Sequence, residues 1–279
     1  MKIKNLEPAW LLVLLTLLIN IVVFTSSSSI SFAGSIKKVA NVPGMVYIPA
    51  GWFWMGCNPK DPYCANVVTP PNRVLTDEKP YHEVYLDAYY IDKNDVTVSE
   101  YKKCVDAQGC TPPVMRKYGN WNGAGRENHP VTWMNWYQVK AYCKWAGETL
   151  PTEAQWEKAA RGTDGRFYPW GNHWDASKGC FDKSSTCVVG SYPQWASPYG
   201  VMDMSGNVWQ WVNDWYDEHY YSNSPDHNPK GPMSGYQHIF RGGSWTAGSA
   251  SLRSALRFAI EPPFKNLNIG FRCVRNVSQ

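Results

Sequence analysis

The chain has little charge and no long basic run. Charged residues make up 18% of its 279 residues, the formal net charge is +4, and no Lys/Arg-rich stretch occurs beyond the extreme N-terminus. Proteins that bind nucleic acids neutralise phosphates with clustered Lys and Arg. The composition therefore argues against a nucleic-acid partner. The hydrophobic content of 44% can supply a sizeable core for one large domain.

Several catalytic and metal signatures are also missing. The chain has no Gly-x-Ser-x-Gly motif, no Gly-rich phosphate loop, and no two cysteines spaced as in a zinc ribbon. Its six histidines, at positions 82, 129, 173, 219, 227 and 238, form no His-x-x-x-His pattern. A conventional hydrolase and a zinc site therefore have no support in the sequence.

No apolar run is long enough to span a bilayer comfortably. The longest, Ala9–Phe24, has 16 residues, against about 20 for a transmembrane helix. It follows Lys2 and Lys4 and precedes a Ser-rich segment ending at Ala33. This order predicts a secretory signal peptide over residues 1–33. The alternative is that this segment stays uncleaved as a membrane anchor, and we expect no other membrane segment. In both cases we expect the domain to be exported to the periplasm or the cell surface.

Export favours disulfides for the eight cysteines, because the compartment is oxidising. Six of them fall into three short-range pairs and two remain. The pairing we predict is Cys57–Cys64, Cys104–Cys110, Cys180–Cys187 and Cys143–Cys273. It is one of many pairings that eight cysteines allow. A Cys143–Cys273 bridge would close a loop of about 130 residues and tie the C-terminal region to the middle of the chain.

The many aromatic and turn-forming residues, among them 15 Trp, 22 Gly and 20 Pro, indicate short regular elements. Capping signals predict helices that begin near Thr97 and Asn135, and a third over residues 153–161 with Thr152 as its N-cap. Strands are expected over residues 45–48, 82–91, 237–242 and 269–274. With no internal repeat, the best division is a linker at 34–41, one domain at 42–275 and a tail at 276–279.

Eight ordered motifs nearly cover the mature chain. They are Met45–Gly56, Glu78–His82, Asp95–Thr97, Leu150–Gly162, Tyr168–Gly171, Tyr199–Trp209, Arg241–Trp245 with Arg257, and Gly270–Cys273. In order and approximate spacing they resemble the formylglycine-generating enzyme family, also called sulfatase-modifying factors. The resemblance implies one compact α+β domain with an elaborated C-type-lectin-like core and low regular secondary structure. A Cys143–Cys273 disulfide matches one found in family enzymes.

The resemblance also implies a copper oxidase that converts a cysteine in a sulfatase peptide to formylglycine, with two cysteine thiolates holding the ion. Here the corresponding region offers Ala247 and, nearest the second position, Leu252. No cysteine lies between Cys187 and Cys273, and copper(I) requires soft ligands. We therefore expect no copper. An iron site assembled from scattered histidines is the weaker alternative.

Two further sites follow from the resemblance. Trp209, Ser244 and Arg257 match residues that line the family's peptide groove, although the same side chains could be packed in the core. The second is a possible calcium site. Its oxygen ligands would be the Asp203 carboxylate, the backbone carbonyls of Gly206 and Val208, and the side chain of Gln210, where family enzymes have Glu. The alternative is a loop held by Trp209, Trp211 and hydrogen bonds alone.

These observations favour an exported domain of this family that lacks the copper-thiolate chemistry and acts in protein or peptide binding, or in assembly. A divergent metal-dependent oxidase of the family is the first alternative, and a lectin-like ligand-binding module is the second. The sequence does not identify the partner or the oligomeric state.

Overall fold

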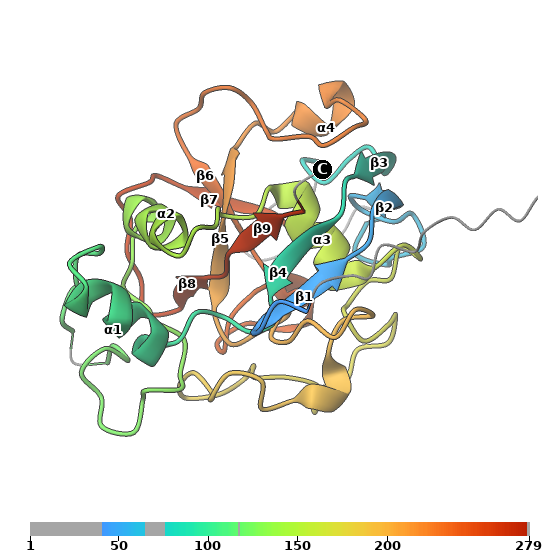
Figure 1. Ribbon diagram of the computed structural model, residues 1–279. Coiled ribbons are helices and arrows are strands. Elements are labelled where there is room, and N and C mark those ends of the chain that lie inside the picture. Colours follow the sequence, from blue (N-terminus) through green and yellow to red (C-terminus); the bar gives the residue numbers. More distant parts are fainter. Residues whose placement is uncertain (1–40, 65–75, 117, 278–279) are drawn as a thin grey trace, which may run out of the picture. The chain divides into compact units, whose positions relative to one another are not determined.

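The structure is a computed structural model that describes residues 41–64, 76–116 and 118–277 (Figure 1). The contacts of the chain group residues 39–279 into one compact unit. The predicted signal peptide and almost all of the predicted linker lie outside the described residues. Within those residues, no helix is both long and apolar enough to cross a membrane.

The three predicted helices are confirmed. They are α1 (Val98–Asp106), α2 (Trp136–Trp145) and α3 (Glu153–Arg161). Each begins with a capping box, in which the side chain of Thr97, Asn135 or Thr152 accepts a hydrogen bond from the backbone N–H three residues later. Because these signals are local, the sequence alone places the helix starts correctly.

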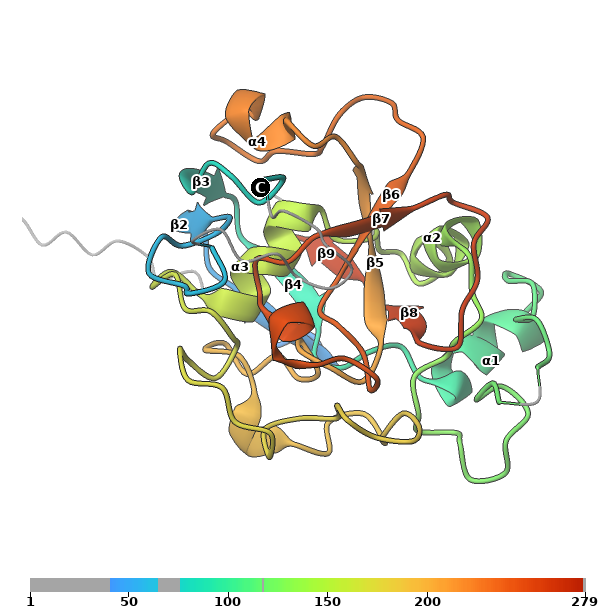
Figure 2. The same ribbon diagram turned by 180° about the vertical axis from the view of Figure 1, so that it is seen from behind.

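The described strands form three small sheets (Figures 1 and 2). The first has the antiparallel order β1 (Met45–Ile48), β4 (Tyr89–Asp92), β9 (Val274–Asn276). The second pairs β2 (Gly51–Met55) with β3 (His82–Leu86). The third has the order β7 (Phe258–Ile260), β6 (His238–Arg241), β5 (Trp209–Trp215), β8 (Ile269–Phe271), with β5 and β8 parallel. The short helices are η1 (Pro193–Trp195), α4 (Tyr220–Asn223) and η2 (Ser249–Leu252).

Two predicted strands are wrong as single elements. Residues 82–91 divide into β3 and β4, which belong to different sheets. The break falls at Asp87, whose backbone N–H and carboxylate both hydrogen-bond to the Asn228 side chain. Residues 269–274 likewise divide into β8 and β9, because Arg272 and Cys273 between them are held by buried polar contacts and a disulfide. The strands β2, β5 and β7 were not predicted.

The α3 helix holds the sheets together. It contacts β2, β3 and β5, and its residues Ala154, Trp156, Ala159 and Ala160 lie in a core cluster with side chains from β1 to β6. A second cluster packs α1 and α2 against β5 and β8. These short elements form the predicted α+β fold with much irregular backbone.

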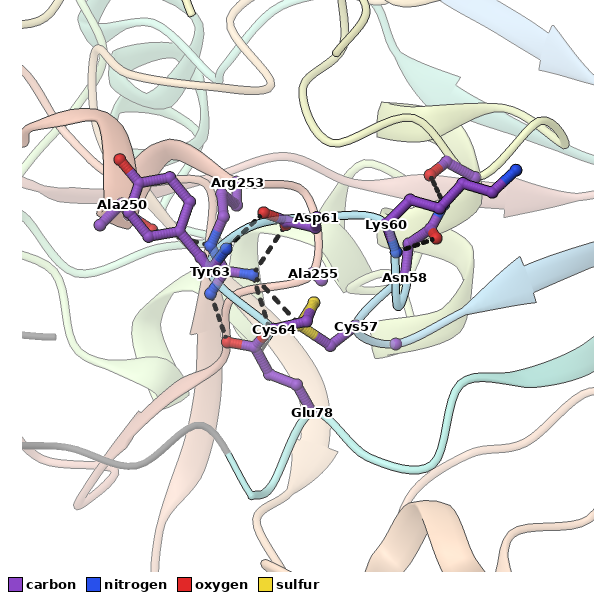
Figure 3. Close-up of a disulfide and its surroundings, with 12 residues drawn as sticks. Cys57, Asn58, Lys60, Asp61, Tyr63, Cys64, Glu78, Ala250, Arg253 and Ala255 are labelled. Atoms are coloured by element: carbon purple, nitrogen blue, oxygen red, sulfur yellow. Dashed lines mark hydrogen bonds and ion pairs between the residues drawn. A yellow bond between two sulfur atoms is a disulfide. The ribbon is translucent and has the colours of Figure 1, made fainter. Parts of the chain in front are cut away.

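All four predicted disulfides are present: Cys57–Cys64, Cys104–Cys110, Cys143–Cys273 and Cys180–Cys187. The Cys143–Cys273 bridge joins α2 to the segment between β8 and β9, as the long-range pairing requires. Around Cys57–Cys64, Arg253 makes hydrogen bonds to Glu78 and Asp61 (Figure 3). The fold is thus stapled at four places, one of them between distant segments.

His238 in β6 is stacked between Trp136 and Trp215, with both pairs of ring centroids 3.7 Å apart. Burial lowers the pKa of His238 to about 4. The neutral ring is therefore favoured in the folded protein, while the unfolded chain takes up a proton below about pH 6.5. Stability is lost as the pH falls from about 6.5 to 4, by an amount on the order of 3 kcal/mol from this residue.

A His238→Gln variant removes this titration. Urea unfolding at several pH values should therefore show that the stability gap between wild type and variant narrows toward pH 4. His219→Gln at an exposed position is the matched control and should leave the wild-type pH dependence intact. A gap for His238→Gln that is constant between pH 7 and pH 4 would contradict the assignment.

Candidate functional site

The Arg241–Trp245 turn needs its two glycines. Gly242 and Gly243 have φ values of +96° and +72°, which side-chain-bearing residues rarely adopt. A Cβ atom on Gly243 would also lie 2.7 Å from the backbone oxygen of Ser251. The turn ends with Trp245, whose backbone N–H donates to Asn207 and whose carbonyl accepts from Lys183, both at 2.9 Å. The Trp245 side chain is therefore held at a defined place beside the Cys180–Cys187 loop.

The positions that the sequence resemblance predicts to correspond to the family's copper ligands are apolar. Leu252 is fully buried in a cluster with Tyr168 and Phe181, and Ala247 packs against the same cluster. The structure thus brings the two positions into one cluster, but neither side chain can bind a metal. All eight cysteines of the chain lie in disulfides. No thiolate is left to hold copper(I).

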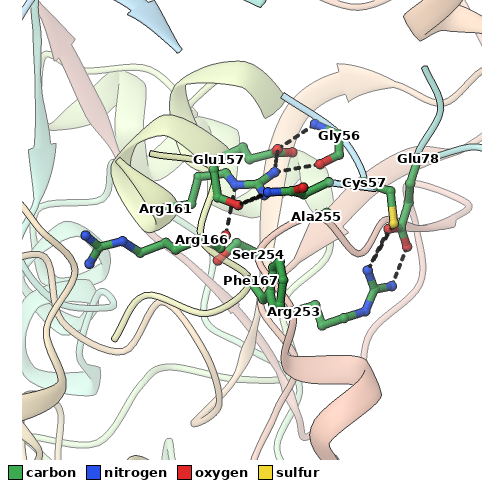
Figure 4. A network of polar contacts seen from close by, with 12 residues as sticks. Gly56, Cys57, Glu78, Glu157, Arg161, Arg166, Phe167, Arg253, Ser254 and Ala255 are labelled. Carbon is green, nitrogen blue, oxygen red and sulfur yellow. Dashed lines mark hydrogen bonds and ion pairs between the residues drawn. The ribbon is translucent and has the colours of Figure 1, made fainter. Parts of the chain in front are cut away.

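Below the turn lies a buried ion-pair network centred on α3. Glu153 accepts from Arg241 at 3.1 Å and from Arg257 at 2.8 and 3.0 Å. Glu157 accepts from Arg241. It also accepts from Arg161 and from the backbone N–H of Gly56, both at 2.8 Å (Figure 4). The two carboxylates are spaced four residues apart on the helix and are almost fully buried. They fix the start of the Arg241–Trp245 turn to α3.

The pKa of Glu157 reflects this arrangement. Burial alone would raise it, but Arg241, Arg161 and the Gly56 N–H outweigh burial and hold the pKa below its usual value. The carboxylate is therefore charged at neutral pH and contributes an ion pair, not an acid for catalysis. This network was not predicted from the sequence. The available signal was the spacing of Glu153, Glu157 and Arg161 along one helix face.

The three residues predicted to line a peptide groove are buried. The Trp209 ring packs edge-on against Phe240 and Phe258, and the Ser244 hydroxyl lies 3.0 Å from that of Thr246. Arg257 is fully buried and pairs with Glu153. The structure does not bring these three side chains together on a common surface. These positions correspond to the packing interpretation, and a role in peptide binding stays a prediction.

The predicted calcium ligands lie on the loop before β5 and, for Gln210, in β5 itself, and they make many hydrogen bonds. The Gln210 side-chain oxygen accepts from Trp156 and from Arg272, both at 2.7 Å, and its amide donates to the Asp203 carbonyl. Asp203 Oδ2 accepts from the Gly190 N–H at 2.7 Å. Gln210 therefore does not fit the role of a calcium ligand, because two donors occupy its oxygen and one of them is a cation. The carboxylate of Asp203 and the carbonyls of Gly206 and Val208 alone are few for calcium.

A cavity of about 660 Å³ opens beside Trp245. We call it the Trp245 cavity. Besides Trp245, three segments far apart in sequence line it, and their residues include Tyr118, Asn120, Arg126, Ser185, Thr186 and Leu267. Tyr118 is 76% exposed and stands at its edge. This site was not predicted from the sequence, because its residues belong to no common motif and meet only through folding.

Asn120, Arg126 and Thr186, which line the Trp245 cavity, belong to a polar network that also includes His129. Asn120 donates to Thr186 Oγ1 at 3.0 Å, and His129 Nδ1 lies 2.9 Å from the same oxygen. The Arg126 Nη1 atom lies 3.1 Å from His129 Nδ1. Burial and Arg126 lower the pKa of His129, so this ring is neutral at pH 7. Among the described residues, Arg126 makes its hydrogen bonds through Nη1. Its Nε and Nη2 atoms are therefore available to a ligand.

Comparisons with known proteins agree with this fold. Residues 33–277 match the family model described as sulfatase-modifying factor enzyme 1-like domain. The formylglycine-generating enzyme of Streptomyces coelicolor is 30% identical over 87% of this chain and 92% of that protein. PvdO from Pseudomonas aeruginosa superimposes with a TM-score of 0.71 at 25% identity, over 85% of this chain and all of PvdO. The chain therefore belongs to the sulfatase-modifying factor enzyme 1-like family.

A further relative is named serine/threonine-protein kinase pkn1, from Chlamydia caviae. It is 35% identical over 72% of this chain, but the match covers only 35% of that protein. The chain thus spans about a third of this larger relative, and the similarity concerns the family domain.

Removing the charge of Glu157 should destabilise the fold strongly. A Glu157→Gln variant removes the buried counter-charge of Arg161 and leaves Arg241 paired with Glu153 alone, and breaking a buried pair in this way typically costs about 3–5 kcal/mol. Chemical denaturation measures the loss, with Glu127→Gln at an exposed position as the control. A loss below about 1 kcal/mol, the range of surface ion pairs, would show that the network does not hold the fold.

Proposed function

We propose that this is an exported domain of the sulfatase-modifying factor family that binds a protein or peptide at the Trp245 cavity and lacks the copper-thiolate oxidation. The observation that carries the proposal is the cavity itself, which lies beside the Arg241–Trp245 turn. The proposed binding site is thus near Ala247 and Leu252, the two apolar positions that the resemblance relates to copper ligands. Its volume of about 660 Å³ falls in the usual range of ligand sites.

The residue types around the cavity suit a peptide. Tyr118 and Trp245 offer aromatic surface with little conformational freedom to lose, as peptide and protein binding sites commonly do. Arg126 offers two donors in a planar arrangement that matches a carboxylate. We therefore expect a ligand segment that carries an Asp, a Glu or a C-terminal carboxylate next to an apolar or aromatic side chain.

Export is supported by the four disulfides, which form and persist in oxidising compartments, and by the predicted signal peptide. A calcium ion at Asp203 remains a secondary proposal without the Gln210 ligand. The wider activities of the larger relatives are not carried over to this chain.

Binding can be tested by panning the oxidised domain against a peptide library and measuring the selected peptides by calorimetry. Tyr118→Ala and Arg126→Gln should each weaken binding at least about tenfold, equivalent to about 1.4 kcal/mol. Tyr236→Ala is the matched control, because Tyr236 has the same 76% exposure but does not line the cavity. It should bind like the wild type.

Two results would contradict the proposal. One is the absence of any peptide that binds with a Kd below about 1 mM, the weakest affinity of practical interest. The other is a selected peptide whose affinity is unchanged by both Tyr118→Ala and Arg126→Gln. Circular dichroism of each variant separates lost binding from lost folding.

A further inference from the structure

A second cavity, of about 460 Å³, lies between the ends of several elements. The end of β4 and the following segment supply Asp92, Asn94 and Asp95 to its lining, α1 supplies Glu100, and the residue Glu148 follows α2. We call it the Asp92 cavity. None of these residues lines the Trp245 cavity, and none is among the ligands that the family resemblance implies for calcium.

Two carboxylates of this cavity lie unusually close. One ligand atom of Asp92 and one of Glu148 are within 4.8 Å of each other and of the Cys273 sulfur. Cys273 is bonded to Cys143 and is therefore no thiolate ligand. Two carboxylate oxygens up to 4.8 Å apart can both reach one Ca²⁺ ion at 2.3–2.6 Å, and Mg²⁺ at 2.0–2.1 Å requires them to approach to about 4.2 Å.

The existing donors neutralise this pair only in part. Asp92 Oδ2 accepts from the Cys273 backbone N–H at 2.7 Å, and Glu148 Oε1 accepts from Arg275 at 3.0 Å. The Arg275 side chain is 45% exposed, so solvent weakens its effect. Lys103 also lines the cavity, but within the described parts of the chain no ion pair joins it to these carboxylates.

Two buried oxygens of the same lining provide an independent observation. Asp95 is 1% exposed; its Oδ1 pairs with Arg272 at 3.1 Å, whereas its Oδ2 has no hydrogen-bond partner among the described residues. The side-chain oxygen of Asn94 is likewise buried without a partner there. The Asn94 oxygen and the ionised form of Asp95 Oδ2 are both acceptors. Buried acceptors without donors are costly and call for an explanation.

We propose that the Asp92 cavity binds a hard divalent cation, Mg²⁺ or Ca²⁺, that is ligated by Asp92 and Glu148 and keeps part of its water shell. A water molecule on a cation turns both hydrogens away from the metal, so it acts as a donor. Such waters satisfy Asp95 Oδ2 and the Asn94 oxygen, which do not belong to the close ligand group. A cavity of this volume has room for an ion with several waters, since each water takes about 30 Å³.

The ion would connect β4 to the end of α2, beside the Cys143–Cys273 bridge. Binding to the folded state alone raises the apparent stability, so both a binding isotherm and a melting temperature report on it. Sites with few charged protein ligands are weak, and a Kd of about 0.1–1 mM is expected for an exported protein.

The test uses the oxidised wild-type domain after chelator treatment and dialysis, titrated by calorimetry with CaCl₂ and separately with MgCl₂. The expected result is one ion bound, with a rise in melting temperature. Glu148→Gln and Asp92→Asn should each weaken binding at least about tenfold. Asp106→Asn, which removes an exposed carboxylate of α1, should bind like the wild type. Asp203→Asn is measured as well, because it separates this site from the calcium position that the resemblance implies.

Three results would overturn the proposal. No binding by the wild type up to about 10 mM of either ion, well above the expected Kd, would show that the cavity holds water only. Unchanged affinity in Glu148→Gln would exclude it as a ligand. Binding lost in Asp203→Asn but retained in Glu148→Gln would place the ion elsewhere. If Glu148→Gln does not fold, Glu148→Asp keeps the charge but shortens the side chain, and it must weaken binding by the same factor.

Discussion

The structure depends on two glutamates buried on one face of α3. Glu153 and Glu157 are almost fully buried and bind Arg241, Arg257 and Arg161. Arg241 begins the Gly-Gly-Ser-Trp turn and Arg257 precedes β7, so a nine-residue helix sets the position of the whole C-terminal segment. Such a network costs desolvation and is retained where its geometry specifies one arrangement of chain segments. Here it explains why so short a helix can organise three small sheets and long irregular loops.

The same constraint explains how the Arg241–Trp245 turn is held without a metal. The turn at Arg241–Trp245 is held from below by α3 and from the side by Asn207 and Lys183, and none of these contacts involves a metal. Ala247 and Leu252 can therefore join an apolar cluster with Tyr168 and Phe181 without disturbing the turn. The outcome is a rigid turn that presents Trp245 to a cavity, which is what a binding site needs.

The sequence predicts features that depend on neighbouring residues, and it does not predict those that depend on contacts between distant segments. The capping boxes at Thr97, Asn135 and Thr152 are local, and the helix starts were correct. The disulfides were also paired correctly, because three of the four bridges span short loops. The division of residues 82–91 into two strands depends on pairing with β2 and with β1, which no local pattern encodes. The Trp245 cavity joins segments near residues 120, 185 and 245, and the burial of Arg257 depends on Glu153, 104 residues away.

We propose that this family member retains the scaffold without the copper-thiolate oxidation. The most direct measurement is to load the oxidised, purified domain with copper(I), remove unbound metal, and incubate it with oxygen and a Cys-containing sulfatase peptide. Elemental analysis then gives the copper content and mass spectrometry detects aldehyde. We predict substoichiometric copper and an unmodified peptide cysteine. Stoichiometric copper together with formylglycine in the peptide would contradict the account, because it would require a metal site that the eight paired cysteines do not provide.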